Sequence, residues 1–534
     1  MRLVSRISTE NQDSDAKDYK LAISRKLIEH KGDLLLLLAA IIITLTSCIY
    51  YLATMLTISD PGLTLDDSWI HVQFARTIFE GHPWEYSTGY PSTGSTSPLW
   101  SVILSSIFYF TSDQFGIVWG VYVISIVFFI GCTFLAGKLA TNYLDHPAWG
   151  FLTMIGFVVV PRNTWLMLSG METPLFVFVL LLSIWMLDKE EMKYDLLLGV
   201  LGGIAYLSRP EGIIVLACIP IRILILGTRG KFNKNRWGLF ILSGIFAVIV
   251  VSPWILQCLA TTGYPLPDTF YAKVHLPTPT EIEAWDIWWG IFVREMPFIP
   301  IGVFLGVILV VKGKPFAWLL PVILTVLYRL STPYASLINN ARYLVPIFDL
   351  FLIVAIVSAG LTFRLALTTI LEIFDETSIN VTGIALLFFV IITPLTVPYV
   401  WQATFYGKAA GNINDMQVHM GYWLNENTPP DAVLAIHDAG AIRFFSNRRV
   451  IDLAGLVSPA IIHGNMTTRE KIQYLHDQGC NYFVFFDELF EYWDNYFPTD
   501  GFSRIYTIHL EDNVVAGRDT MSVFQIFWEN TAFS

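Results

Sequence analysis

The sequence predicts a polytopic α-helical membrane protein that carries an α/β domain at its C-terminus. Of its 534 residues, 54% are hydrophobic and only 14% are charged, whereas a soluble domain holds about 25% charged residues. The apolar residues also gather in long runs. The third observation is a polar tail at 404–534 with 8 Lys and Arg against 16 Asp and Glu, so that it carries −8 of the total charge of −11. This acidic balance disfavours nucleic acid as a partner.

The apolar runs give about eleven candidate transmembrane helices within a membrane module at 34–403. Several runs are short for a straight span, which indicates that some of these helices are broken. We expect a cytoplasmic tail at 1–33 before the module, and outer-face loops at 57–114 and 260–298. The candidate spans are 34–56, 115–137, 148–168, 174–187, 196–208, 210–227, 237–259, 299–311, 315–331, 343–360 and 380–401.

The apolar run "SPLWSVILSSIFYFTS" at 97–112 is left out of this set because of how the basic residues then sort. The segment before the first span holds five Lys and Arg between Lys17 and Lys31, so it should be cytoplasmic. If 97–112 lies on the membrane surface, the basic cluster around Lys231 and Lys234 falls on the same side. If it spans, that cluster moves outside. The positive-inside rule therefore favours a surface helix and predicts that the C-terminal domain is extracytoplasmic.

The polar tail has the pattern of a small α/β domain. Short apolar runs bounded by turn residues predict strands, and "TTREKIQYLHDQG" at 467–479 has helical periodicity and ends at a glycine. A turn-rich connection at 425–431 precedes the first strand. The predicted strands are 432–438, 449–455, 481–486, 504–510 and 522–528.

Two adjacent aspartates, Asp66 and Asp67, stand just after the first span in "LTLDDSWIHVQFARTIFEGHPWEY". The apolar residues that follow recur at helical spacing, so the pair begins an amphipathic helix on the outer face. One aspartate could cap that helix, but a cap needs only one carboxylate. The second indicates chemistry, because a carboxylate pair can bind a divalent cation such as Mg²⁺, Mn²⁺ or Ca²⁺, or place a general base.

Further charged residues fall on loops that this topology puts on the same side of the membrane. Glu172 in "LMLSGMETPLF" is a third candidate catalytic carboxylate, although an acid in a first turn also suits the helix dipole. Arg162 lies ten residues earlier in an apolar stretch and is a candidate partner for it. His71 follows Asp67 by four residues and shares its helix face, either as an acceptor contact or as a satisfied polar residue.

Three cations on the outer loops form a candidate site for a phosphate headgroup. Arg209, Lys273 and Arg342 could each simply extend to the membrane surface. Three of them beside a carboxylate pair, however, suit a phosphate headgroup, which needs both fork-like and point-charge donors. The remaining pocket candidates are Glu211, next to Arg209, and Asp268 and Tyr271, on the loop that carries Lys273.

Several stretches occur in a characteristic order between about residues 60 and 460. They are "LDD" at 65–67, "LSGMETPLF", "LSRPEG", "PLPDTFYAK" and "HDAGAIRFFSNRRVIDLAGLVSP". In this order they resemble the GT-C superfamily of multi-pass glycosyltransferases, and within it the branch of the mycobacterial terminal arabinofuranosyltransferase. The acidic pair after the first span resembles the catalytic hallmark of that superfamily, and 97–112 resembles the surface helix that follows it. Asp268 departs from the pattern, where asparagine is expected.

The resemblance implies an enzyme that moves a sugar from a polyprenyl-phosphate donor to a glycan or protein acceptor on the outer face, with inversion. The chain has no Walker sequence, no GxGxxG after a strand, no HExxH and no GxSxG, so the donor is expected to come from the bilayer. Two alternatives are open. One is a flippase for lipid-linked sugars, whose charges should lie at mid-depth, and the other is a sugar-binding relative without catalysis.

Overall fold

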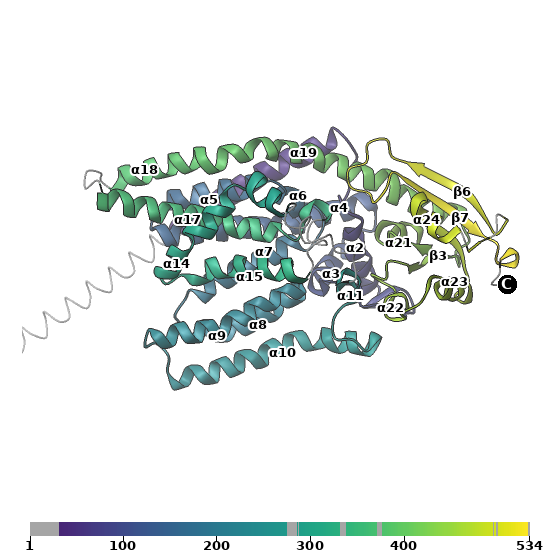
Figure 1. Cartoon of the computed structure of the whole chain (residues 1–534), viewed down its shortest axis with the longest axis horizontal. Coiled ribbons are helices and arrows are strands. Elements are labelled where there is room, and N and C mark those ends of the chain that lie inside the picture. The colour runs from purple at the N-terminus through teal and green to yellow at the C-terminus, as the bar shows by residue number, and fades with distance from the viewer. Residues whose placement is uncertain are drawn as a thin grey trace, which may run out of the picture.

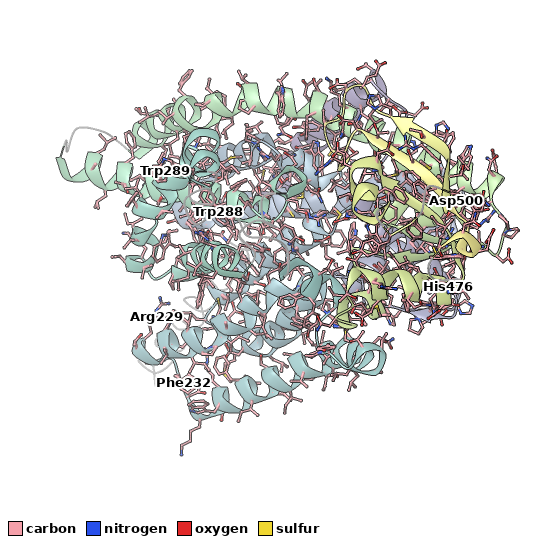
Figure 2. All side chains as sticks on the ribbon, turned by 45° about the vertical axis from the view of Figure 1, so that its right-hand side comes forward. Arg229, Phe232, Trp288, Trp289, His476 and Asp500 are labelled. Atoms are coloured by element: carbon pink, nitrogen blue, oxygen red, sulfur yellow. The ribbon has the colours of Figure 1, made fainter. Side chains whose placement is uncertain are left out.

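The computed structural model describes residues 31–274, 286, 288–331, 338–370, 376–494, 496–497 and 500–531. Helices dominate the chain up to Asn427, and a five-stranded sheet with its own helices follows. The long helices lie side by side, and the sheet domain sits at one end of this bundle (Figure 1). Figure 2 shows Arg229 and Phe232 at the other end, far from His476 and Asp500 of the sheet domain.

Six of the described helices are long and apolar enough to cross a membrane. The chain is therefore a multi-pass membrane protein. Shorter apolar helices accompany them, and every predicted span overlaps a helix, although the total of about eleven spans stays a prediction. The six are Lys31–Leu56, Gln114–Leu144, Pro210–Thr228, Lys234–Thr262, Asn339–Leu367 and Asn380–Asn427.

Local sequence sets the ends of these helices. α4 (Gln114–Leu144) begins where the Asp113 carboxylate accepts a hydrogen bond of 2.8 Å from the backbone N–H of Gly116, and it ends at Asp145, whose φ is 53°. Its 31 residues extend about 46 Å, more than the ~30 Å of bilayer hydrocarbon. The other bundle helices are α5 (Pro147–Val159), α6 (Asn163–Met167), α7 (Thr173–Leu187), α8 (Met192–Ser208), α9 (Ile213–Thr228), α10 (Lys234–Thr262), α13 (Phe298–Leu305), α14 (Val307–Val311), α15 (Pro315–Ser331), α16 (Ile338–Ala341) and α17 (Val345–Ile370).

One continuous helical path joins the bundle to the sheet domain. It runs through α18 (Glu376–Leu387), a π-helical turn, α19 (Thr393–Ile413), a second π-helical turn and α20 (His419–Asn427). Positions 403 and 404, between which the sequence analysis divides the two domains, both lie inside α19. π-Helical turns often occur at functional sites, and the second one, Asn414–Val418, reaches the site described below.

The C-terminal sheet has the strand order β4-β3-β5-β7-β6. β3, β4 and β5 are parallel, whereas β7 and β6 run antiparallel. Successive residues of β3 alternate between two buried cores, as the strand period of two requires. The elements are β3 (Val433–Ile436), α21 (Gly440–Ser446), β4 (Arg449–Asp452), α22 (Pro459–His463), α23 (Thr468–Asp477), β5 (Cys480–Phe486), α24 (Asp487–Asp494), β6 (Phe502–His509) and β7 (Thr520–Ile526).

Three short helices lie between the bundle and the sheet domain (Figure 1). They are α2 (Asp66–Phe79), α3 (Pro98–Ser105) and α11 (Asp268–Val274), and a small hairpin of β1 (Glu85–Ser87) and β2 (Tyr90–Pro91) follows α2. α3 and the 3-10 turn after it, Ser106–Tyr109, fall in the range predicted to lie on the membrane surface. These helices bring the predicted site residues to the junction of the two parts.

Candidate active site

Asp66 joins the start of α2 to the start of α21. Its two carboxylate oxygens accept hydrogen bonds of 2.8 Å each from the backbone N–H groups of Gly440 and Ala441. α2 itself has no side-chain cap, so the capping that the sequence suggested is directed at another helix, in the C-terminal domain. Burial and the charge of Asp438 raise the pKa of Asp66, although the two N–H groups act in the opposite direction.

Gly440 is required for this close approach. A Cβ at that position would clash with the backbone carbonyl of Asp66 and also meet its side chain. Apolar contacts support the same junction, because the ring of Trp69 lies 5.2 Å from that of Phe444 and 4.7 Å from that of Phe445. The sheet domain is therefore docked on α2 by both polar and aromatic contacts.

Asp67 has a different partner. Its Oδ2 lies 2.6 Å from Nη2 of Arg342, which is buried. The same guanidinium donates a hydrogen bond of 3.3 Å to the hydroxyl of Tyr343. Asp67 therefore pairs with one of the three cations that the sequence assigns to the donor phosphate.

Glu172, Arg209 and His71 form a second buried cluster. Glu172 stands directly before α7, and its Oε1 lies 3.1 Å from Nη1 of Arg209 while its Oε2 lies 3.3 Å from Nε2 of His71. Burial raises the pKa of Glu172, but the contact with His71 and the charge of Arg209 lower it by more, to well below its usual range. Glu172 is therefore held as a carboxylate.

Glu211 and Tyr343 complete the surroundings of Arg209. Oε2 of Glu211 lies 3.4 Å from Nε of Arg209, and the guanidinium lies 4.3 Å from the centre of the Tyr343 ring. Glu172, Arg209, Glu211 and Tyr343 line a cavity of about 310 Å³ together with apolar residues such as Phe270. This cavity can hold a charged headgroup against a guanidinium.

An apolar groove of about 660 Å³ adjoins that cavity between α8, α9 and α10. Tyr206 and Ile213 line both. The groove walls are otherwise mainly aliphatic and include Leu216, Ile223 and Val248. A lipid chain in the groove would thus reach a charged cavity at one end.

Asp66 and Asp67 line another cavity, of about 200 Å³, and the C-terminal domain supplies part of its wall. His437 and Asp438 lie on that part, immediately after β3. Asp438 accepts a hydrogen bond of 2.8 Å from Nε2 of Gln417 and lies 3.3 Å from Nδ1 of His437. Burial lowers the pKa of His437, but the bond to Asp438 outweighs it and raises the pKa overall.

Asp268 and Tyr271 lie at the edge of the C-terminal domain. Oδ1 of the buried Asp268 lies 2.9 Å from Nε2 of His463, in α22, and the ring of Tyr271 lies 5.2 Å from the same imidazole. The ring of Tyr264 stacks on His463 at 4.2 Å. The resemblance predicts asparagine at position 268. The aspartate that stands there contacts His463, and this contact joins α11 to the C-terminal domain.

Arg162 and Lys273 are the last two of the predicted site residues. Arg162 donates a hydrogen bond of 2.7 Å to Oδ1 of Asn340. Glu172 pairs with His71 and Arg209 in place of the expected Arg162. Lys273 lies on α11, but its side chain is outside the described part of the structure.

Sequence reasoning missed His437, Asp438, Gln417 and His463 as members of the site. The sequence did contain a signal for two of them, since His437 and Asp438 are the last two residues of the strand predicted at 432–438. Ligands bind at the carboxyl ends of parallel strands in open α/β sheets, so the residues after β3 are natural candidates. What the sequence could not supply was the position of this strand end, opposite Asp66.

Comparisons with known proteins agree on the fold. Residues 411–524 match the family described as a domain of unknown function, DUF8728. No curated protein sequence matches the chain. The whole structure is similar to ArnT from Cupriavidus metallidurans bound to undecaprenyl phosphate, with a TM-score of 0.57 and 12% identity over 92% of this chain and 98% of that chain.

Two structures of an oligosaccharyltransferase from Archaeoglobus fulgidus are also similar. The complex with Zn and sulfate has a TM-score of 0.55 at 12% identity, and covers 85% of this chain and 69% of that chain. AglB with an inhibitory peptide and a dolichol-phosphate has a TM-score of 0.52 at 12% identity, over 86% and 70%. The fold that the resemblance predicts is therefore confirmed, while the arabinofuranosyltransferase branch stays a prediction.

The described residues around the aspartate pair do not fit a metal ion. Asp66 gives both its oxygens to N–H groups, and Asp67 faces the positive charge of Arg342. Within the described part of the chain, no group of three or more His, Cys, Asp or Glu side chains could hold an ion. We therefore derive no step through a metal, and the tentative assignment of Asp66 and Asp67 as ligands has no structural support here.

Proposed function

We propose that this chain is a membrane glycosyltransferase that moves a sugar from a polyprenyl-phosphate donor to a hydroxyl of a glycan or protein acceptor. One observation carries the proposal: an apolar groove adjoins a cavity with a buried arginine, and Arg342 links Tyr343 of that cavity to Asp67, which lines the cavity of the aspartate pair. Two proteins of similar fold bind such lipids: the ArnT structure holds undecaprenyl phosphate, and the AglB structure holds a dolichol-phosphate.

The donor lipid would lie in the groove between α8, α9 and α10. Because Tyr206 and Ile213 line both the groove and the adjoining cavity, a chain in the groove would bring its phosphate beside Arg209. A planar guanidinium suits phosphate because it donates two parallel hydrogen bonds. Arg342, whose neighbour Tyr343 lines the same cavity, lies between this phosphate site and Asp67.

The cluster around Arg209 and Arg342 needs one more cation to balance the charge of a bound phosphate. Two arginines, Arg209 and Arg342, are already matched by Glu172, Glu211 and Asp67. A donor phosphate adds negative charge to a buried site, which is costly unless it is paired. We assign that role to Lys273, which follows Phe270 by three positions on α11, and Phe270 lines the cavity.

The chemistry then needs a base and no strong acid. A carboxylate of the Asp66 and Asp67 pair accepts the proton of the acceptor hydroxyl while its oxygen attacks the anomeric carbon. The bond from that carbon to the phosphate oxygen breaks, and its electron pair stays on the phosphate, which the arginines stabilise. Attack from the face opposite the phosphate inverts the anomeric centre.

The orientation is part of the proposal. Arg229 and Lys231 pair with Glu190 at the end of the bundle away from the sheet domain (Figure 2). Basic residues concentrate on the cytoplasmic side of membrane proteins, so the sheet domain and the site would be extracytoplasmic.

The direct test is release of polyprenyl phosphate. Purified protein is incubated with a panel of undecaprenyl- and dolichyl-phosphate sugars, with and without a panel of octyl glycosides and peptides as acceptors. We expect at least one donor to yield polyprenyl phosphate and a glycosylated acceptor. Protein that transfers no sugar from any donor, yet equilibrates these lipids across reconstituted vesicles, would establish the flippase in place of the transferase.

A further inference from the structure

The C-terminal domain contributes a wall to the cavity that holds the aspartate pair. Residues from the end of α19 and the π-helical turn after it, from the segment that follows β3 and from two later loops all line it. Every one of these domain-side residues falls within 411–524, the segment that matches the domain of unknown function. They are Ile413, Gln417, His437, Asp438, Ala439, Ala454, Leu456, Val515, Ala516 and Gly517.

Asp438 is the acidic side chain on that wall. Its carboxylate is fixed from two sides, by Nε2 of Gln417 at 2.8 Å and by Nδ1 of His437 at 3.3 Å. The side chain nevertheless keeps 18% of its surface exposed. An oriented carboxylate that still faces a cavity can accept a hydrogen bond from a ligand hydroxyl.

The backbone fixes Asp438 relative to Asp66. Asp66 is bound to the N–H groups of Gly440 and Ala441, which follow Asp438 by two and three residues. The hydroxyl of Tyr86 donates a hydrogen bond of 2.6 Å to the carbonyl of Ala439, in the same short segment. The segment after β3 therefore fixes both carboxylates around one cavity.

We propose that Asp438 is a further catalytic carboxylate that binds the acceptor, and that the acceptor is a saccharide held through two hydroxyls. In this arrangement, which rests on the proposed function, one hydroxyl faces the Asp66 and Asp67 pair and attacks the donor. A neighbouring hydroxyl of the same sugar donates a hydrogen bond to Asp438. The attacking oxygen gives its proton to the bundle-side carboxylate, so Asp438 takes part in no bond change and holds the sugar in position for attack.

Two carboxylates that line one cavity favour a saccharide over a serine or threonine side chain. A carboxylate acts only as an acceptor when it is ionised, so two of them around one cavity suit a ligand with two donors. A sugar ring carries neighbouring hydroxyls, whereas a serine or threonine side chain has one. The exposed part of the Asp438 carboxylate can accept a second hydroxyl, and this additional hydrogen bond favours a diol.

The test measures transfer to octyl glycosides by wild type, by Asp438→Asn and by Asp431→Asn. Asp431 is exposed and lies outside the cavity, so the control removes the same charge from the same domain. We expect Asp438→Asn to lower the kcat/KM for acceptor roughly tenfold to a hundredfold, since it loses a hydrogen bond to a charged group. Binding of undecaprenyl phosphate should not change, and Asp431→Asn should match wild type.

A monodeoxy acceptor identifies the hydroxyl that contacts Asp438. For wild type, removing the correct neighbouring hydroxyl should cost about as much as Asp438→Asn, and in the variant the same removal should cost little more. Asp438→Glu, which keeps the charge, should recover part of the activity and covers the case in which the asparagine variant folds poorly.

Three results would overturn the inference. They are transfer by Asp438→Asn at the wild-type rate, an equal loss of undecaprenyl phosphate binding, and full additivity of the variant with every deoxy acceptor. Wild-type protein that transfers no sugar at all would instead reject the proposed function, so the two failures can be told apart.

Discussion

Oδ2 of Asp66 lies 2.8 Å from the backbone nitrogen of Gly440, 374 residues further along the chain. This contact ties the first outer helix to the C-terminal domain. It also means that the cavity around the candidate catalytic pair is completed only when the two parts dock, because the domain supplies part of its wall.

The first prediction concerns this junction. Gly440→Ala should destabilise the docked domain, because its Cβ would clash with the carbonyl of Asp66. Overpacking of this kind costs about 1–3 kcal/mol, and the melting temperature in detergent should fall. Gly238→Ala is the matched control, since nothing lies within 4 Å of a Cβ there. Equal melting temperatures for wild type and both variants would show that the junction tolerates the extra carbon.

The second prediction is a pH dependence from Asp452, at the end of β4. Burial raises its pKa to about 6 from an ordinary value of 3.8, although the N–H groups of Val457, Ala454 and Leu456 oppose the change. Between about pH 4 and pH 6 the folded chain keeps a proton that the unfolded chain has lost. The free energy of unfolding should therefore decrease as the pH rises through this window, and above it the cost persists.

Asp452→Asn removes the carboxyl group that titrates in this window. We expect the wild type to lose stability relative to the variant as the pH rises from 4 to 6, measured as melting temperature against pH. Asp431→Asn, at an exposed position, should keep the wild-type profile. A wild-type and Asp452→Asn difference that is constant with pH would contradict the assignment.

Much of the architecture could be predicted from hydropathy and periodicity. The runs of apolar residues overlap the bundle helices, and alternating runs such as 481–486 overlap the strands, here β5. These features depend on local sequence, where the period of the pattern reports the element. The helix predicted at 467–479 is present as α23, with a capping box between Thr467 and Glu470.

The contacts within the site were less predictable than the fold, because they join segments that are distant in the sequence. The aspartate pair could be selected from its doubling and its place after a span. The partners of Asp66 could not, since backbone N–H groups in the C-terminal domain leave no pattern in side-chain identity. The partner of Asp268 could not be predicted either, because His463 lies on α22, far along the chain.

The third prediction concerns the donor phosphate. Arg342→Ala and Lys273→Ala should each raise the apparent KM for donor roughly tenfold to a hundredfold, which corresponds to about 1.5–3 kcal/mol for a hydrogen bond to a charged group. Initial rates against donor concentration, at saturating acceptor, give this value. The exposed Lys231→Ala at the far end of the bundle is the control. If neither site variant changes the dependence on donor, the phosphate binds elsewhere.

The fourth prediction is the orientation in the membrane. A cysteine introduced at Lys234 should be protected from a membrane-impermeant maleimide in intact cells, while one introduced at Asp500 should react, because the two positions are predicted to lie on opposite sides. The five native cysteines are all buried and give little background. Labelling at 234 without labelling at 500 would reverse the topology.

The fifth prediction is that the Asp66 and Asp67 pair performs sugar transfer. The most direct measurement is single-turnover transfer from bound donor by wild type, Asp66→Asn and Asp67→Asn, with donor binding and melting temperature recorded for each. The melting temperature matters for Asp66→Asn, because its amide would set an N–H group against that of Gly440 or Ala441. We predict that at least one variant binds donor, remains folded and transfers sugar roughly a hundredfold or more slowly than wild type. Transfer at near wild-type rates by both folded variants would contradict the claim.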